Sequence, residues 1–267
     1  MRIALGVSYD GSSFDGWQSQ PSGNTVQDHL ERALSGIAAT EVRVVAAGRT
    51  DAGVHALGQV VHFDTGIERP DTAWVRGTNA VLPDTIAVQW ARPVGDAFNA
   101  RFSAIARRYV YVLYAHPVRP SVQAGKVGWY HGPLDAKAMQ LAAHSLVGTH
   151  DFTAFRSSQC QAKTPVRTVR SLSIHSREPY ILFEIVADAF LHHMVRNIVG
   201  CLLYVGKGAH PPAWMSELLD KRNRALAAPT LAADGLYLAQ VEYASDWNLP
   251  TFPRMMPGWM PDTCALE

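Results

Sequence analysis

Cysteine is scarce in this chain, with three residues among 267. The three are Cys160, Cys201 and Cys264, and no two of them form a Cys-x-x-Cys pair. An odd number without that spacing excludes a disulfide framework and a cysteine-ligated zinc site. We therefore expect a protein of a reducing compartment, the cytoplasm.

Long hydrophobic runs are also lacking. Hydrophobic residues make up 48% of the chain, but no stretch reaches the roughly 20 consecutive apolar residues that a membrane-spanning helix needs. The opening residues, Met1-Arg-Ile-Ala-Leu-Gly, have the spacing of a strand and lack the layout of a signal peptide. These features favour a globular protein with a sizeable core and no membrane anchor.

The chain has no large excess of positive or negative charge, since the net charge is only +1. Its distribution is more informative, because two stretches carry basic residues and no acidic ones, namely Arg101, Arg107, Arg108, Arg119 and Lys126, then Arg156, Lys163, Arg167, Arg170 and Arg177. Aromatic residues such as Tyr109 and Trp129 interleave with the first stretch. This mixture suits phosphate contact and base stacking. The alternative is two solvated sheet faces whose arginine stems cover apolar surface.

The order of elements in the first hundred residues predicts a split βαβ, or ferredoxin-like, unit. Strands are expected at residues 2–9, 42–45, 59–63 and 86–90. Thr25 resembles a capping residue for a helix over 26–37, and Asp71 opens a second helix that runs to Leu82. Residues 92–103, with Pro93 and Gly95, form a link.

A similar pattern follows the link. Strands are expected at 108–114, 166–175, 180–190 and 236–243, and helices at 134–147, 192–206 and 214–222. We therefore predict an α+β fold of two pseudo-symmetric ferredoxin-like halves whose antiparallel sheets join, with a cleft between them. The predicted domains are residues 1–103 and 104–245. A Pro-rich tail at 246–267 follows, held by Trp247 and Trp259.

The stretch from Ala47 to Ala56, Ala-Gly-Arg-Thr-Asp-Ala-Gly-Val-His-Ala, holds a glycine-rich loop between two β-branched runs. Arg49 and Asp51 lie two residues apart, so in an extended backbone they point to one side and can pair. A carboxylate held beside a guanidinium favours the ionised form, which suits a nucleophile rather than a general acid. The alternative is a turn in which Asp51 bonds only backbone amides.

The residues 48–56 resemble the catalytic loop of the tRNA pseudouridine synthase A (TruA) family. Four further stretches are similar to blocks of that family in the same order, at residues 100–109, 148–155, 190–200 and 233–238. The resemblance extends over about residues 1 to 245. One departure is Asn99, where the family pattern has histidine before Ala-Arg-Phe-Ser.

The resemblance implies an isomerase that turns uridine into pseudouridine, with Asp51 as the catalytic carboxylate. Tyr109 matches the family's active-site tyrosine. Arg49 would hold Asp51 and the nucleotide, Arg196 would pair with Asp51, and Leu236 would pack in the site. Taken from the residues alone, Arg196 has Glu184 or Asp188 as alternative partners, and Tyr109 and Leu236 have ordinary core roles as alternatives.

The implied substrate is the anticodon stem-loop of tRNA, at positions 38, 39 and 40, bound by a homodimer in which one tRNA contacts both subunits. The RNA-binding residues expected from the basic stretches are Arg101, Arg107, Arg108, Arg156, Lys163 and Arg167. No metal or redox cofactor is expected, because the reaction oxidises nothing.

Two other functions fit parts of the sequence. A non-catalytic RNA-binding module would also use ferredoxin-like units, but the aromatic octapeptide typical of such modules is missing. A hydrolase using Asp51 and His55 lacks a serine or cysteine nucleophile motif. A metal held by His192 and His193 is disfavoured if both lie on one helix, because neighbouring helical residues point in different directions.

Overall fold

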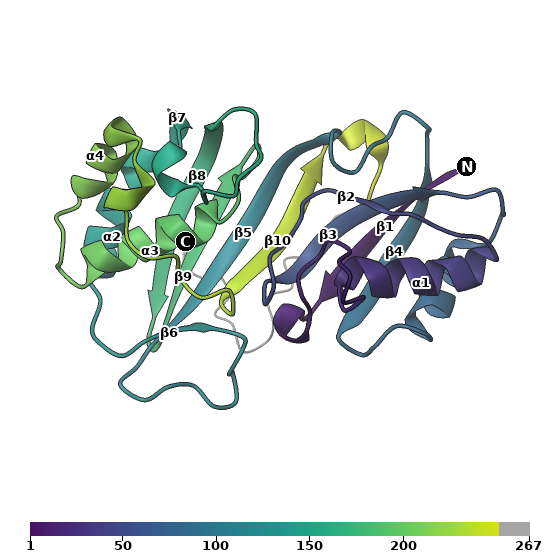
Figure 1. The fold of residues 1–267 in the computed structure, drawn as a ribbon, viewed down its shortest axis with the longest axis horizontal. Helices are drawn as coiled ribbons and strands as arrows, with labels where there is room; N and C mark the ends of the chain where they lie inside the picture. Colours follow the sequence, from purple (N-terminus) through teal and green to yellow (C-terminus); the bar gives the residue numbers. More distant parts are fainter. Residues whose placement is uncertain (251–267) are drawn as a thin grey trace. The chain divides into compact units, whose positions relative to one another are not determined.

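The computed structural model describes residues 1–250, which form two compact units (Figure 1). The first unit contains residues 1–107 and 237–250, and the second contains residues 108–236. Each unit mixes strands with helices, so the predicted α+β class is confirmed. Within residues 1–250, no helix combines the length and apolarity needed to cross a membrane.

The strands of the first unit follow the order β4 (Ile86–Val94), β1 (Arg2–Tyr9), β3 (His55–Asp64) and β10 (Leu236–Tyr243), the last from Tyr237 onward. β1 pairs antiparallel with both β3 and β4, whereas β10 runs parallel to β3. The last strand, which sequence analysis assigns to the second half, therefore pairs within the first unit.

Helix α1 (Val26–Ala38) begins where the sequence predicts, because the Thr25 side chain accepts a hydrogen bond from the Asp28 amide at its first turn. Leu30 and Leu34 on its inner face are fully buried. Their spacing of four residues places both side chains on one stripe, which is the amphipathic pattern that marks this helix in the sequence.

The helix predicted from Asp71 to Leu82 differs from expectation, because Ala73–Gly77 forms a π-helical turn at its centre. Gly77 lies against α1, and a Cβ atom added there would come within 2.9 Å of the Ile37 Cδ1 atom. The glycine therefore permits a close approach between this turn and α1. Hydrophobic periodicity does not report on such a change in helical pitch.

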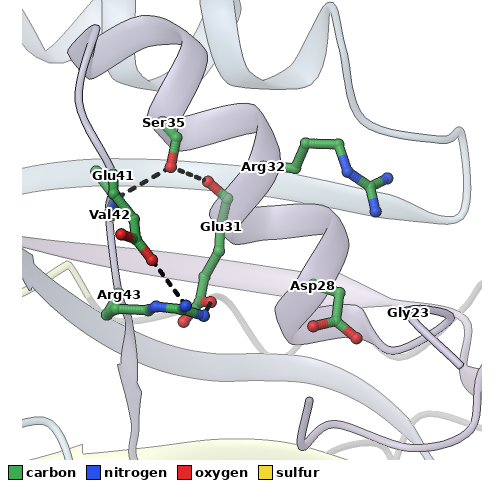
Figure 2. A pocket seen from close by; sticks show the side chains of 8 residues that line it. All are labelled: Gly23, Asp28, Glu31, Arg32, Ser35, Glu41, Val42 and Arg43. Atoms are coloured by element: carbon green, nitrogen blue, oxygen red, sulfur yellow. Dashed lines mark hydrogen bonds and ion pairs between the residues drawn. The ribbon is translucent and has the colours of Figure 1, made fainter. Parts of the chain in front are cut away.

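The strand predicted at Val42–Val45 is mostly absent, since β2 contains only Val45–Ala46. Two hydrogen bonds to side chains of α1 are the cause, and Figure 2 shows the first of them, between Val42 and Ser35. The Val42 amide donates to Ser35 Oγ at 2.9 Å and the Val44 amide donates to Glu31 Oε1 at 2.9 Å. Side chains of the helix take the amides that a neighbouring strand would otherwise bind.

The second unit contains β5 (Ala104–Ala115, from Arg108 onward), β9 (Tyr180–Ala187), β8 (Val166–Arg177) and β7 (Gly148–Asp151) in that order. β8 pairs antiparallel with β7 and β9. A short strand, β6 (Gly128–Tyr130), pairs parallel with β5. β6 and β7 are too short to give a periodic signal, so the sequence does not predict them.

The helices of the second unit are shorter than predicted. α2 (Ala136–Ala143) passes into a 3-10 turn at His144–Leu146, and α4 covers Trp214–Lys221. α3 (Met194–Gly206) begins after His193, whose φ of 62° is incompatible with a right-handed helix. Further 3-10 turns of this unit lie at Thr153–Phe155 and Arg224–Leu226, and the first unit has two at Gly11–Ser13 and Ser245–Trp247.

The start of the predicted tail packs on the first unit, because the Trp247 and Phe98 ring centroids are 5.1 Å apart. Trp259, the second predicted anchor, lies outside the described residues.

Candidate active site

Asp51 is half-buried and lies in a tight loop of the first unit between β2 and β3. The Ala47 amide donates to Val60 O at 2.8 Å, and Gln59 Nε2 donates to Gly48 O at 2.6 Å. Past Asp51, the Val54 amide returns to Asp51 O at 3.1 Å. These bonds make a closed turn, so the carboxylate is carried by a backbone with little freedom.

The segment from Asp10 to Trp17 clasps this loop from two sides. The Trp17 amide donates to Thr50 O at 3.0 Å. Gly16, at φ +96°, packs so closely that an added Cβ would lie 2.9 Å from Thr50 O, and a Cβ on Gly11 would lie 2.0 Å from Val54 O. Sequence analysis misses this role, although the two glycines five residues apart are the signal that backbone approaches backbone there.

His55, which the hydrolase alternative would pair with Asp51, is buried beside the clasp. Its Nδ1 accepts from the Gly11 amide at 3.1 Å and lies 3.2 Å from Asp10 Oδ1. The Gly11 amide can donate to Nδ1 only when that nitrogen carries no proton. The contact between His55 and Asp10 would be an ion pair only if the imidazole were protonated. The ring stacks on Tyr237 with centroids 4.5 Å apart.

Arg49 is exposed, and the ion pairs of residues 1–250 include none between Arg49 and Asp51. The predicted pair required an extended backbone, but the loop turns at this point. Arg49 therefore faces solvent from the same loop that carries the carboxylate.

Arg107 was expected to bind RNA, but it is buried, with only 9% of its surface exposed. Its Nη2 donates to Ala47 O at 3.0 Å and to Arg101 O at 2.7 Å, and its Nη1 donates to Ala104 O at 3.2 Å. A buried guanidinium that donates three hydrogen bonds to backbone carbonyls acts as a brace. This burial disfavours the predicted RNA contact of Arg107.

Asn99, where the resembled pattern has histidine, organises a turn. Its Oδ1 accepts from the amides of Arg101 and Phe102 at 3.0 and 3.1 Å. Its own amide donates to Ser103 Oγ at 3.0 Å. A short amide side chain suits this Asx-type turn, which accounts for asparagine at this position.

Tyr109 and Arg108 lie inside the second unit. The Tyr109 ring is 8% exposed and meets Phe190 edge to face, with centroids 5.0 Å apart and an interplanar angle of 82°. Arg108 is buried and its Nη1 lies 3.3 Å from Glu184 Oε1. Its burial and its ion pair with Glu184 disfavour the predicted RNA contact of Arg108.

Arg196 and Leu236 also lie in the second unit. Arg196 Nε donates to Leu231 O at 2.8 Å from the first turn of α3. Leu236 is 6% exposed, and its amide donates to Ala233 O at 2.8 Å. Gly235 before it packs so tightly that an added Cβ would lie 2.5 Å from Val112 O. The turn that ends at Gly235 is thus held closely against β5.

His192 and His193 precede α3 and do not lie on it. Their ring centroids are 4.0 Å apart. The expectation that the two rings point in different directions assumed a helix, and it is wrong because the left-handed backbone of His193 redirects its side chain.

The remaining predicted RNA-binding residues are accessible to different degrees. Arg101 and Lys163 are exposed, whereas Arg156 and Arg167 are half-buried. Arg167 Nη1 donates to Thr164 O at 3.0 Å, so part of its guanidinium is committed to its own loop. The hollow beside α1, of about 240 Å³, is lined by charged residues of α1 and the 41–43 segment and by none of the loop at 47–56 (Figure 2).

Comparison with known proteins decides the family. The family model described as tRNA pseudouridine synthase matches residues 6–103 and 142–244. The chain belongs to this family.

Its relatives in the tRNA pseudouridine synthase family are similar over nearly their whole length. A protein of Paraburkholderia xenovorans named tRNA pseudouridine synthase A is 60% identical over 249 residues, which cover 93% of this chain and 92% of the relative. The protein of the same name from Burkholderia thailandensis is 57% identical over 94% of this chain and 93% of its own. A solved structure of a Cbf5-Nop10-Gar1 complex matches at 14% identity over 88% of this chain and 48% of the other chain, with a TM-score of 0.38.

Proposed function

We propose that this chain is the enzyme that converts uridine to pseudouridine at positions 38, 39 and 40 of the tRNA anticodon stem-loop, with Asp51 as the catalytic carboxylate. The observation that carries the proposal is the loop at 47–56, where Asp51 sits on a backbone fixed by the clasp, in a chain of the tRNA pseudouridine synthase family. The reaction takes place in the cytoplasm, where the tRNA substrate is found.

The chemistry requires breaking the bond between the uracil and C1′ of the ribose, turning the base, and joining C5 to C1′. Positive charge develops on the sugar as the first bond breaks. The Asp51 carboxylate stabilises that charge, and it either attacks C1′ or removes the neighbouring C2′ proton. The C5 proton leaves at the end, and the Tyr109 hydroxyl takes part in that transfer.

Recognition rests on tRNA shape and phosphates, because the bases around the three positions differ. Arg49, Arg196 and Leu236 surround the target nucleotide after it leaves its stack, a step that costs a few kcal/mol. Exposed Arg101 and Lys163, with the half-buried Arg156 and Arg167, contact phosphates. The protein acts as a homodimer in which one tRNA contacts both subunits, which gathers the basic stretches of two nearly neutral chains.

Release of tritium from tRNA labelled at uracil C5, measured without added metal, tests the activity. Asp51→Asn keeps the size of the side chain and removes its charge, so we expect release to fall by roughly 10⁴-fold while tRNA binding persists. Asp84→Asn, at an exposed turn, serves as the matched control and keeps full activity. Equal release by Asp51→Asn and wild type would contradict the role of Asp51.

The alternative function, a non-catalytic RNA-binding module, has a distinct outcome in the same assay. It predicts that wild-type protein binds tRNA without releasing tritium at any protein concentration. Release that is stoichiometric with product pseudouridine, measured by nucleoside mass spectrometry, would remove this alternative.

A further inference from the structure

Phe102 is the exposed aromatic residue of the turn at 99–103 in the first unit. Its side chain is 78% exposed, whereas Phe98, four residues earlier, is fully buried. A large apolar ring on the surface loses the hydrophobic stabilisation that burial would give. Single exposed apolar residues are common, so exposure alone assigns no role to this ring.

The backbone that carries Phe102 is unusually well tied for a surface turn. Asn99 Oδ1 accepts from two of its amides, and the Ser103 amide donates to Asn99 O at 2.8 Å. Ala100 is held on both sides, because its amide donates to His62 Nδ1 at 3.1 Å and its carbonyl accepts from the Tyr243 hydroxyl at 2.7 Å. The ring is therefore presented on a fixed support.

A cation accompanies the ring. The Arg101 guanidinium carbon lies 5.4 Å from the centroid of the Phe102 ring, and Arg101 is itself exposed. An aromatic face next to a guanidinium matches the two parts of a nucleotide, a flat base and an anionic phosphate. A stable protein interface would need about 800 Å² from each partner, far more than one ring beside a charged group supplies.

The turn is joined to the loop of Asp51 through one buried group. Arg107 Nη2 donates both to Arg101 O, next to Phe102, and to Ala47 O, at the start of the loop. Ala47 is four residues from Asp51, a span of at most about 14 Å of chain. A nucleotide on Phe102 therefore lies within a short stretch of RNA from one at Asp51.

We infer that Phe102 is a stacking platform for an unpaired base near the target uridine, with Arg101 holding the phosphate beside it. The inference rests on the proposed function, because it takes tRNA as the ligand. A base that stacks on the platform recovers part of the stacking energy lost when the anticodon stem-loop is distorted, so the platform stabilises the open form of the substrate.

Substitutions that separate aromatic from merely apolar character test the inference. In fluorescence anisotropy with full-length tRNA, we expect Phe102→Ala to weaken binding by about tenfold. Phe102→Leu should bind as weakly as Phe102→Ala, and Phe102→Trp should bind at least as tightly as wild type. Val81→Ala, at a side chain that is 64% exposed in the same unit, is the matched control and should change nothing.

Three results would overturn the inference. The first is wild-type binding by Phe102→Ala. The second is wild-type binding by Phe102→Leu, because any apolar side chain would then suffice. The third is a change of oligomeric state in Phe102→Ala by sedimentation, which would assign the ring to a contact with a second copy of the chain.

A positional readout completes the test. A photoreactive benzoylphenylalanine at position 102 should crosslink to tRNA at one nucleotide within the anticodon stem-loop, and crosslinking elsewhere on the tRNA would overturn the inference. Tritium release by the wild-type protein is measured in parallel. Its absence would remove the proposed function, whereas its presence with unaffected Phe102 variants would remove only the platform.

Discussion

At the scale of single residues, burial separates the arginines that hold the fold from those that can meet RNA. Arg107→Ala would leave the carbonyls of Ala47, Arg101 and Ala104 without their donor, and we expect it to lower the free energy of unfolding by about 3 kcal/mol. Urea denaturation followed by circular dichroism measures this. Arg101→Ala, at the exposed neighbour, should leave stability unchanged and weaken tRNA binding instead.

The opposite pattern would contradict the role of Arg107 as a brace. If Arg107→Ala keeps wild-type stability and reduces the salt dependence of tRNA binding by about one unit of slope, the guanidinium is a phosphate ligand.

Two cysteines of the described residues, Cys160 and Cys201, differ in burial. Burial raises the pKa of the Cys201 thiol to about 11, and a hydrogen bond from the Ala228 amide opposes this only in part. At pH 8 we therefore expect iodoacetamide to modify Cys160, which is half-buried, and to spare Cys201 until the protein unfolds. Peptide mass spectrometry localises the label. Equal labelling of both in the native protein would show that α3 opens readily.

At the scale of elements, the clasp at 10–17 determines where the Asp51 loop lies. Gly16→Ala places a Cβ 2.9 Å from Thr50 O at a φ of +96°, so the loop must shift. We expect kcat for pseudouridine formation to fall at least tenfold with little change in tRNA affinity. Gly23→Ala is the matched control, because its φ is also positive, at +65°, but nothing lies within 4 Å.

The Gly23→Ala control separates the effect of backbone strain at a positive φ from the effect of displacing the Asp51 loop. Equal losses of activity in Gly16→Ala and Gly23→Ala would mean that backbone strain alone reduces activity. A loss confined to Gly16→Ala would attribute it to contact with the loop.

The turn at 99–103 should respond to pH through His62. Burial lowers the pKa of His62, the charge of Arg2 lowers it further, and Asp64 opposes both. Because the folded pKa is below the unfolded value of about 6.5, the stabilisation is complete above pH 6.5 and is lost as pH falls through the folded pKa. Protonation also removes the acceptor of the Ala100 amide.

We therefore expect the free energy of unfolding to decrease between pH 7 and pH 5, and His62→Asn to flatten that decrease. Urea titrations at each pH measure it. His131→Asn, at an exposed histidine, should keep the wild-type profile. A wild-type slope in His62→Asn would show that another group causes the dependence.

At the scale of the whole molecule, the proposed homodimer makes a simple prediction. Native mass spectrometry should give twice the chain mass of 29.2 kDa and should find tRNA bound to the dimer, because one tRNA contacts both subunits. A complex of one chain with one tRNA, fully active at nanomolar protein concentration, would contradict this arrangement.

The sequence predicts much of the fold, because the long elements have strong periodicity. Leu30 and Leu34 mark α1, and the β-branched runs mark β1, β8 and β9. The misses have different causes, namely side chains that take backbone amides in one case and an unusual local backbone conformation in another. Glu31 and Ser35 shorten β2, and the left-handed His193 delays α3.

In the candidate site, too, features that are local in sequence can be predicted and long-range contacts cannot. The loop that carries Asp51 is predictable, because its glycines and its family block are local in sequence. The braced position of Arg107 is not, because its acceptor Ala47 is 60 residues away. A basic run in the sequence gives the sign of its charges but not their exposure.

The return of the chain at β10 has a consequence for biosynthesis. Tyr237 and Leu238 pair with His55 and Ala56, directly after the Asp51 loop, so the first unit lacks one of its strands until residues 236–243 have been synthesised. The described residues of the second unit, 108–236, are all synthesised before that pairing can form. A nascent chain stalled before residue 237 would therefore expose the unpaired edge of β3 beside the Asp51 loop.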